Sequence, residues 1–121
     1  MSSTIAIVSS VVDVPALVRA VKAGALGVKV EAGSEPEAVI QAIPEEDDLR
    51  GVFCDADQMD AVLLALGPRR ARVFGLSPEV QEAALVTCLE DARVGGLIAV
   101  TRGEARSWEI TFLARRMSAP N

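Results

Sequence analysis

The residues able to carry out chemistry are few, and they fall where predicted strands end. The 121-residue chain contains no histidine, which excludes a Ser-His-Asp triad, a Cys-His pair and histidine phosphotransfer. Asp55 follows the apolar run 51–54, and Ser9 and Ser10 follow the apolar run 4–8. These two strand ends therefore carry one aspartate and two neutral hydroxyl groups.

The cysteines and the other carboxylates show no metal-binding or redox pattern. Cys54 and Cys88 lie far apart in an expected strand and an expected helix, which is typical of buried small hydrophobes rather than of a disulfide scaffold. The charge of Asp55 also disfavours a thiolate at Cys54. The acidic run 45–48 lacks metal-ligand spacing and is expected to be a solvated loop. We expect no metal, no cofactor and no enzymatic activity.

Strands and helices alternate along the chain, and their short connections require parallel strands with right-handed crossovers. The pattern predicts one open, doubly wound sheet of five parallel strands, an α/β fold of (βα)5 type, whose ligand-binding loops follow the strands. The expected strands are 4–8, 28–31, 51–54, 72–76 and 97–100, and the helices begin at caps Asp13, Ser34, Asp57 and Ser77 and at about Glu104. The helix that Ser77 opens is expected to include Val80, and the last helix to end at Met117. Gly24 and Gly27 are expected to end the first helix, and Gly95-Gly96 the fourth.

Length and charge bound the class of protein. One domain over residues 1–117 accounts for the length, with 118–121 as a tail or the start of an interdomain linker. A net charge of −5 argues against nucleic-acid binding, so the arginines in 69–72 and 115–116 are expected to complement helix dipoles. No signal peptide or membrane-length apolar run is present, which favours a soluble, cytoplasmic protein without membrane contact.

The five units resemble the receiver domain of bacterial response regulators, a flavodoxin-like module of two-component signal transduction. The resemblance spans essentially the whole chain and is strongest over 5–43 and 91–99. Asp55 stands at the position of the receiver phosphoacceptor, at the end of the third strand. Ser77 matches the switch hydroxyl after the fourth strand, although a serine before Pro-Glu is equally typical of a helix cap.

The chain departs from receivers at the residues that support phosphorylation. Ser9 and Ser10 occupy the positions of two acidic magnesium ligands, and neutral hydroxyls cannot replace carboxylates for a hard cation. Only Arg102, displaced by one or two positions, could stand in for the lysine of the fifth strand. We therefore predict a pseudo-receiver in which Asp55 is vestigial, so that Asp55→Asn leaves partner binding nearly unchanged. If Asp55 neighbours no cation, the substitution is expected to stabilise the fold slightly by relieving repulsion with Asp57. The alternative is a Mg²⁺-dependent phosphoacceptor with a remodelled site that uses Asp55.

The last helix carries two apolar stripes where a sheet needs only one. The first stripe, expected on the sheet, is Ile110, Leu113, Ala114 and Met117; the second, nearly opposite, is Ala105, Trp108 and Phe112. The second stripe is either a contact face or a cluster in which Trp108 folds over the neighbouring helix. We expect a signalling module that acts by protein–protein interaction, as a homodimer through this helix or by docking an effector.

Overall fold

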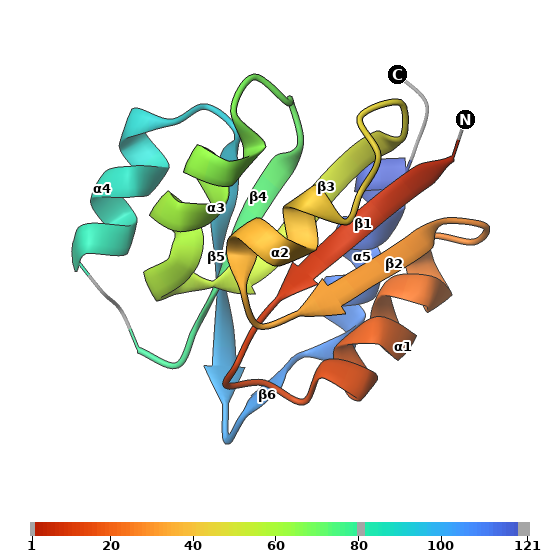
Figure 1. Ribbon diagram of the computed structural model, residues 1–121. Coiled ribbons are helices and arrows are strands. Elements are labelled where there is room, and N and C mark those ends of the chain that lie inside the picture. Colours follow the sequence, from red (N-terminus) through yellow and green to blue (C-terminus); the bar gives the residue numbers. More distant parts are fainter. Residues whose placement is uncertain (1, 80–81, 119–121) are drawn as a thin grey trace.

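The computed structural model describes residues 2–79 and 82–118, which form an α/β fold with one mixed sheet. The strands are β1 (Ser3–Val8), β2 (Lys29–Gly33), β3 (Asp48–Asp55), β4 (Arg72–Ser77), β5 (Val94–Thr101) and β6 (Glu104–Ala105). The helices are α1 (Val14–Gly24), α2 (Pro36–Gln41), α3 (Met59–Leu66), α4 (Glu82–Glu90) and α5 (Ser107–Ser118), and a 3₁₀ turn, η1 (Ala56–Gln58), precedes α3. The spatial order is β2-β1-β3-β4-β5-β6, with β1 to β5 parallel and β6 antiparallel to β5 (Figure 1).

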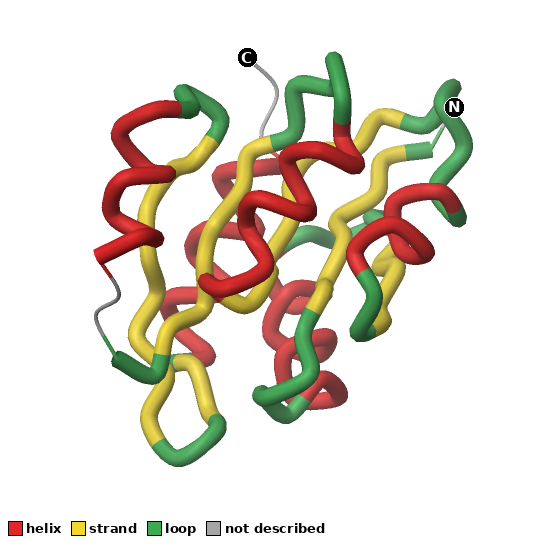
Figure 2. Tube along the Cα trace, turned by 60° about the vertical axis from the view of Figure 1, so that its left-hand side comes forward, coloured by secondary structure: helices red, strands yellow, loops and turns green. Residues whose placement is uncertain are grey.

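Helices cover both faces of the sheet, α1 and α5 on one and α2, α3 and α4 on the other (Figure 2). Alternation along β1 divides the core accordingly, because successive strand side chains point to opposite faces. Ala6 and Val8 belong to the cluster under α2 and α3, whereas Ile5 and Ile7 belong to the cluster under α1 and α5. The continuous apolar run that predicted a strand buried on both faces is thereby explained.

The five predicted parallel strands are confirmed, and so is one of the predicted caps. Asp13 accepts a hydrogen bond from the backbone N–H of Ala16 at 3.2 Å, at the start of α1. β3 begins earlier than expected, at Asp48, so the acidic run 45–48 is only partly a loop. α3 is a short helix of 8 residues, in line with the short segment that the sequence offers.

A sixth strand was not predicted, and it displaces the start of the last helix. Arg102 and Gly103 have φ angles of 54° and 76°, the left-handed pair that a two-residue hairpin turn requires. The chain therefore reverses after Thr101 and pairs Glu104 and Ala105 with the end of β5. α5 begins at Ser107 and ends at Ser118, and the remaining tail lies outside the described residues.

Two further predicted caps, Ser34 and Asp57, are wrong. Pro36 forces the residue before it into an extended conformation, and Glu35 at φ −108° and ψ 114° becomes the cap, without a side-chain hydrogen bond. Asp57 lies inside η1, and α3 begins only after Gln58. In both cases the neighbouring backbone, rather than the polar side chain, determines where the helix starts.

The fourth helix also differs from its predicted limits. Its described part begins at Glu82 and ends at Glu90, and Val80, expected within it, lies outside the described residues. Gly95 and Gly96 do not end this helix but lie in β5. A Cβ atom on Gly95 would come within 2.6 Å of the Phe74 ring, so this glycine leaves room for an aromatic side chain of β4.

Candidate functional site

Neighbouring strands bring the predicted site residues together. β1 pairs with β3 in parallel, with Val8 opposite Cys54, so the chain beyond Val8 emerges beside Asp55. The carboxyl ends of parallel strands are where open α/β sheets bind ligands. Ser9, Ser10 and Asp55 form a cluster at this edge, and Asp55 is only 3% exposed.

Both oxygens of the Asp55 carboxylate are occupied by hydrogen bonds from the two serines. The Ser9 hydroxyl donates to Oδ1 at 2.6 Å. The backbone N–H of Ser10 donates to Oδ2 at 2.9 Å, and its hydroxyl donates to the same oxygen at 3.3 Å. Hydrogen bonds to a charged acceptor in a buried site are stronger than neutral ones, so these donors satisfy a carboxylate that has little access to water.

The direction of the Ser9 hydroxyl is fixed by the loop that follows. Its oxygen accepts from the backbone N–H groups of Val11 at 3.3 Å and Val12 at 3.2 Å. A serine hydroxyl has one proton to donate and two lone pairs, and all three are used here. The Ser9 proton must therefore point at Asp55. A local serine-to-backbone turn of this kind is common, but its coupling to Asp55 was not predicted from the sequence.

The donor set does not suit the magnesium ion that receivers use. A hard divalent cation requires oxygen acceptors, preferably carboxylates, whereas both serines present donors to Asp55. Within residues 2–79 and 82–118, no group of three His, Cys, Asp or Glu residues could hold a metal ion. The cluster therefore offers hydrogen-bond donors where a metal ion needs acceptors.

Ser77 lies on the adjacent strand but does not join the cluster. It is the buried last residue of β4, and its hydroxyl donates to the backbone carbonyl of Glu79. Pro78 and Glu79 are bends rather than helical residues, so Ser77 is not the cap of α4. Its hydroxyl is committed to its own loop.

Arg102 is also separate from Asp55. It is exposed in the turn between β5 and β6, and among the described residues no hydrogen bond or ion pair joins it to the carboxylate. The hairpin that places Arg102 in a tight turn explains the separation. The structure thus unites Ser9, Ser10 and Asp55 and leaves Ser77 and Arg102 outside.

Cys54 is an inert thiol beside the site. Burial raises its pKa to about 12, with smaller contributions from the negative charges of Asp55 and Asp57. The sequence indicated the charge effect, but burial is the larger cause because Cys54 is completely inaccessible in β3. The thiolate that would act as nucleophile is not populated at neutral pH.

Thiol labelling is expected to distinguish the two cysteines. At pH 8 in native buffer, Cys88, which is partly exposed on α4, should react with an aromatic disulfide reagent well before Cys54. Cys54 should react only at the rate of unfolding, since its labelling requires an opened chain. Mass spectrometry of digested samples measures each site, with Cys88→Ser as the control. Rapid native labelling of Cys54 would contradict its burial.

The aromatic stripe of the last helix is exposed. Trp108 is 64% exposed and Phe112 52%, so Trp108 does not fold into the core. The guanidinium of Arg116 lies 5.8 Å from the centre of the Phe112 ring, at cation–π distance. Ala105 lies on β6 rather than on α5, and it packs, partly buried, against the core cluster that includes α1 and α5.

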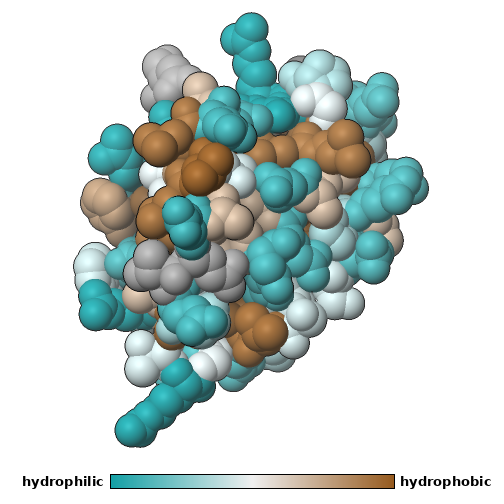
Figure 3. All heavy atoms as spheres, turned by 90° about the vertical axis from the view of Figure 1, so that its left-hand side faces the viewer, coloured by the Kyte–Doolittle hydropathy of each residue, from teal (hydrophilic) through white to brown (hydrophobic). Residues whose placement is uncertain are grey.

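A second exposed apolar surface, on α4 and α3, was not predicted from the sequence. Leu85, Val86 and Leu89 on α4 are exposed, as is Leu64 on α3, and hydrophobic side chains gather on the side of the molecule where α4 lies (Figure 3). A surface helix buries one stripe only. The four successive apolar residues of 83–86 exceed that stripe, and this excess was the available signal.

The strand order and the comparisons with known proteins complete the description of the chain. No helix in the described ranges is long and apolar enough to cross a membrane. The strand order β2-β1-β3-β4-β5 is compatible with a flavodoxin-like fold, to which β6 is added. No family model, curated protein or solved structure matches this chain.

Proposed function

We propose that the domain is a degenerate receiver, a signalling module that acts by protein–protein contact and without phosphorylation of Asp55. The hydrogen-bonded Ser9–Ser10–Asp55 cluster carries this proposal. Two neutral hydroxyls take the positions of the magnesium ligands and point their protons at the carboxylate that a receiver would phosphorylate. The strand order and the location of Asp55 at the end of β3 support the receiver-like arrangement.

Phosphorylation at Asp55 is opposed by the same hydrogen bonds. A carboxylate that attacks a phosphoryl group must turn a lone pair toward phosphorus. The hydrogen bonds from Ser9 and Ser10 leave a lone pair on Oδ1, but they stabilise the charge on both oxygens and so weaken the carboxylate as a nucleophile. Attack also brings negative charges together, which a metal ion normally neutralises. Asp55 therefore serves as the acceptor that fixes the β1–α1 loop on β3.

Incubation with Mg²⁺ and acetyl phosphate tests this proposal. Intact mass should show no added phosphoryl group, and beryllofluoride should leave the amide resonances around Asp55 unchanged. The double variant Ser9→Asp/Ser10→Asp supplies the missing carboxylates and is expected to gain Mg²⁺ binding. Phosphorylation of Asp55 in the unaltered chain would establish the remodelled phosphoacceptor instead.

The proposed contact surface is the exposed face of α5. Exposed aromatic residues are frequent anchors of protein interfaces, and Trp108 and Phe112 lie one helical turn apart, where side chains are neighbours. Ile110 and Ala114, both 0% exposed, already supply the stripe that packs on the sheet. The aromatic pair is therefore available to a second copy or to an effector.

Trp108→Ala is expected to separate association from folding. Its thermal midpoint should stay within a few degrees of that of the unaltered chain, because the side chain is 64% exposed. Self-association or effector capture should weaken by about 2 kcal/mol, as is typical of an aromatic anchor. Sedimentation and pull-down measure the loss.

Ile110→Ala, on the buried face of the same helix, is the control for Trp108→Ala. It should lower the free energy of unfolding by about 3 kcal/mol. If Trp108→Ala behaves like Ile110→Ala and leaves association unchanged, the contact surface lies elsewhere.

A further inference from the structure

A charged cavity lies at the end of the sheet opposite Asp55. Its volume is about 350 Å³, within the range of sites for small molecules. It opens where β3 and β4 begin and where α5 ends. The lining residues are Glu45, Asp47, Asp48, Leu49, Arg50, Arg69, Arg70, Arg72, Arg116 and Met117.

The cavity concentrates positive charge in an acidic protein. Five arginines and three carboxylates line it, although the whole chain carries a net charge of −5. The sequence predicted that four of these arginines, all except Arg50, complement helix ends. Arg116 does lie in the last turn of α5, but Arg72 is the first residue of β4. The fold thus brings arginines from separate segments of the chain together around one cavity.

Two of these arginines hold the cavity wall. The Arg69 guanidinium donates to the carbonyl oxygens of Ile43 at 3.3 Å and Pro44 at 2.8 Å, which fixes the loop after α2. Arg50 pairs with Asp48, with 2.7 Å between Nε and Oδ2. That approach is out of line with the N–H bond, so the Arg50 Nε–H has no acceptor among the described residues.

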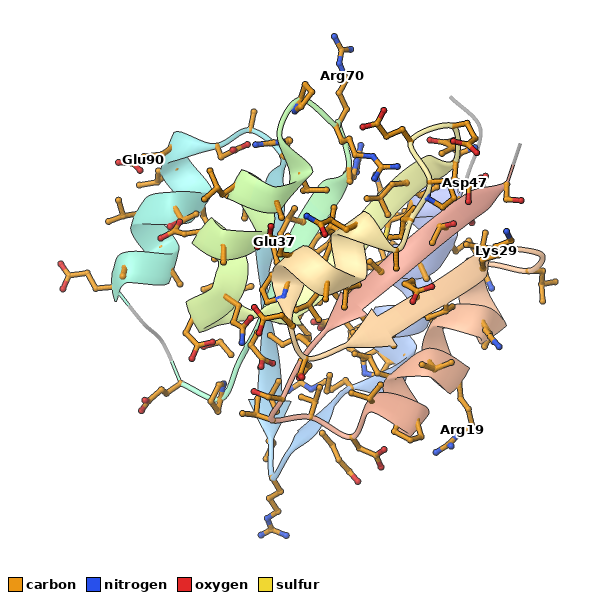
Figure 4. The ribbon with its side chains drawn as sticks, viewed as in Figure 1. Arg19, Lys29, Glu37, Asp47, Arg70 and Glu90 are labelled. Atoms are coloured by element: carbon orange, nitrogen blue, oxygen red, sulfur yellow. The ribbon has the colours of Figure 1, made fainter. Side chains whose placement is uncertain are left out.

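The other arginines keep their donors available. Among residues 2–79 and 82–118, the side chains of Arg70, Arg72 and Arg116 form no ion pair and donate no hydrogen bond. Arg70 projects away from the body of the protein (Figure 4). Arg72 and Arg116 have no carboxylate partner among the described residues, and they lie beside the buried apolar residues Leu49 and Met117, which keep part of the wall dry. The Arg116 guanidinium also contacts the Phe112 ring, with 5.8 Å to the ring centre. Charge interactions are stronger beside such a wall than in open water.

We propose that this cavity binds the phosphate group of a small phosphorylated metabolite through Arg72 and Arg116. Planar guanidinium groups bind phosphate oxygens in a bidentate manner. Asp47 and Asp48 face the rest of the ligand, where they accept hydrogen bonds from hydroxyl or amino groups. The same carboxylates repel the continuous backbone of a nucleic acid, so the site favours a small ligand. The proposal is independent of the role of Asp55.

A titration with pyrophosphate at constant ionic strength tests the site. Amide resonances of 47–50, 69–73 and 115–117 should shift, and the thermal midpoint should rise with ligand concentration. Arg72→Gln/Arg116→Gln should weaken binding about tenfold or more, the effect of losing a charged hydrogen bond. Both side chains are exposed, so the double variant is expected to fold.

Arg19→Gln is the matched control, because Arg19 is an exposed arginine on α1 far from Arg70 (Figure 4). It should bind pyrophosphate like the unaltered chain. Adenosine monophosphate should bind at the same residues as pyrophosphate. A short single-stranded oligonucleotide should bind no more tightly than adenosine monophosphate. Absent or scattered resonance shifts, equal losses in Arg19→Gln, or tighter oligonucleotide binding would each overturn the proposal. If the double variant fails to fold, the amide resonance shifts of the unaltered chain decide whether pyrophosphate binds at this cavity.

Discussion

Gly24→Ala is expected to lower the free energy of unfolding by about 3 kcal/mol, the cost of forcing atoms into a packed interior. A Cβ atom at this position would overlap the carbonyl oxygen of Thr111 and lie 3.2 Å from the backbone nitrogen of Arg115. These are backbone atoms of α5, which cannot move aside as a flexible side chain can. Relief requires α1 and α5 to separate, although the Thr111 hydroxyl donates to the Ala20 carbonyl at 2.9 Å and ties them together.

The expected destabilisation by Gly24→Ala is opposite in sign to the effect that helix propensity predicts, so the experiment distinguishes the two. Helix propensity alone predicts that Gly→Ala stabilises a helix by about 1 kcal/mol. Ala23→Gly, at the exposed neighbouring position, is the control, and it should cost about 1 kcal/mol through propensity. Chemical denaturation measures both variants. A Gly24→Ala protein as stable as the unaltered chain would show that α1 and α5 do not approach this closely.

Sequence reasoning identified Gly24 as the end of the first helix, which is confirmed, but it did not reveal the contact of Gly24 with α5. A glycine after an amphipathic run is a typical helix end, and α1 does end there. The close approach of α5, which lies almost ninety residues away, leaves no local signal. Residues whose role depends on a distant element are therefore recognised only in the folded chain.

The strands were predictable because their signals are local. Apolar runs such as 4–8 are long enough to be buried on both faces and too short for core helices. β6 was not predictable in this way, since two residues carry no periodicity, and only the Arg102-Gly103 turn defines it. The predictions of helix caps at Ser34 and Asp57 were wrong because local backbone preferences compete with side-chain capping.

The candidate site was predicted in composition but not in chemistry. Ser9, Ser10 and Asp55 were expected at one edge of the sheet, because parallel strands end together. Their sequence shows what is missing for magnesium. It does not show that Ser9 uses its lone pairs on Val11 and Val12 and must donate to Asp55. That constraint changes the expected effect of a substitution at Asp55.

Asp55→Asn is expected to destabilise the fold by about 2–3 kcal/mol, the cost of leaving a buried polar group unsatisfied. From the sequence alone, this substitution was expected to leave partner binding nearly unchanged and, with no cation beside Asp55, to stabilise the fold slightly. The hydrogen bonds reverse that expectation, because an amide has one acceptor oxygen where the carboxylate has two. If its NH₂ group faces Ser9, it meets a hydroxyl whose lone pairs are occupied. If it faces Ser10, two donors oppose each other.

A double-mutant cycle with Ser9→Ala isolates this effect. Removal of the Ser9 hydroxyl lets the side-chain amide introduced by Asp55→Asn turn its NH₂ group toward the vacated space while its oxygen accepts from Ser10. The double variant should therefore be more stable than the sum of the single losses predicts, with a coupling of about 1 kcal/mol or more. Ser10→Ala is the control, since it removes only the 3.3 Å bond and leaves the backbone donor in place.

Denaturant unfolding of the four proteins measures the cycle, and acetyl phosphate treatment adds a functional measurement. In a phosphoacceptor, Asp55→Asn abolishes phosphorylation with little change in stability, because the carboxylate is exposed to its donor and metal. In the cluster seen here, Asp55 is 3% exposed and satisfied by neutral donors, so the proposed function predicts a loss of stability and no phosphorylation of the unaltered chain. An Asp55→Asn protein of unchanged stability, additive with Ser9→Ala, would remove the structural role assigned to this carboxylate.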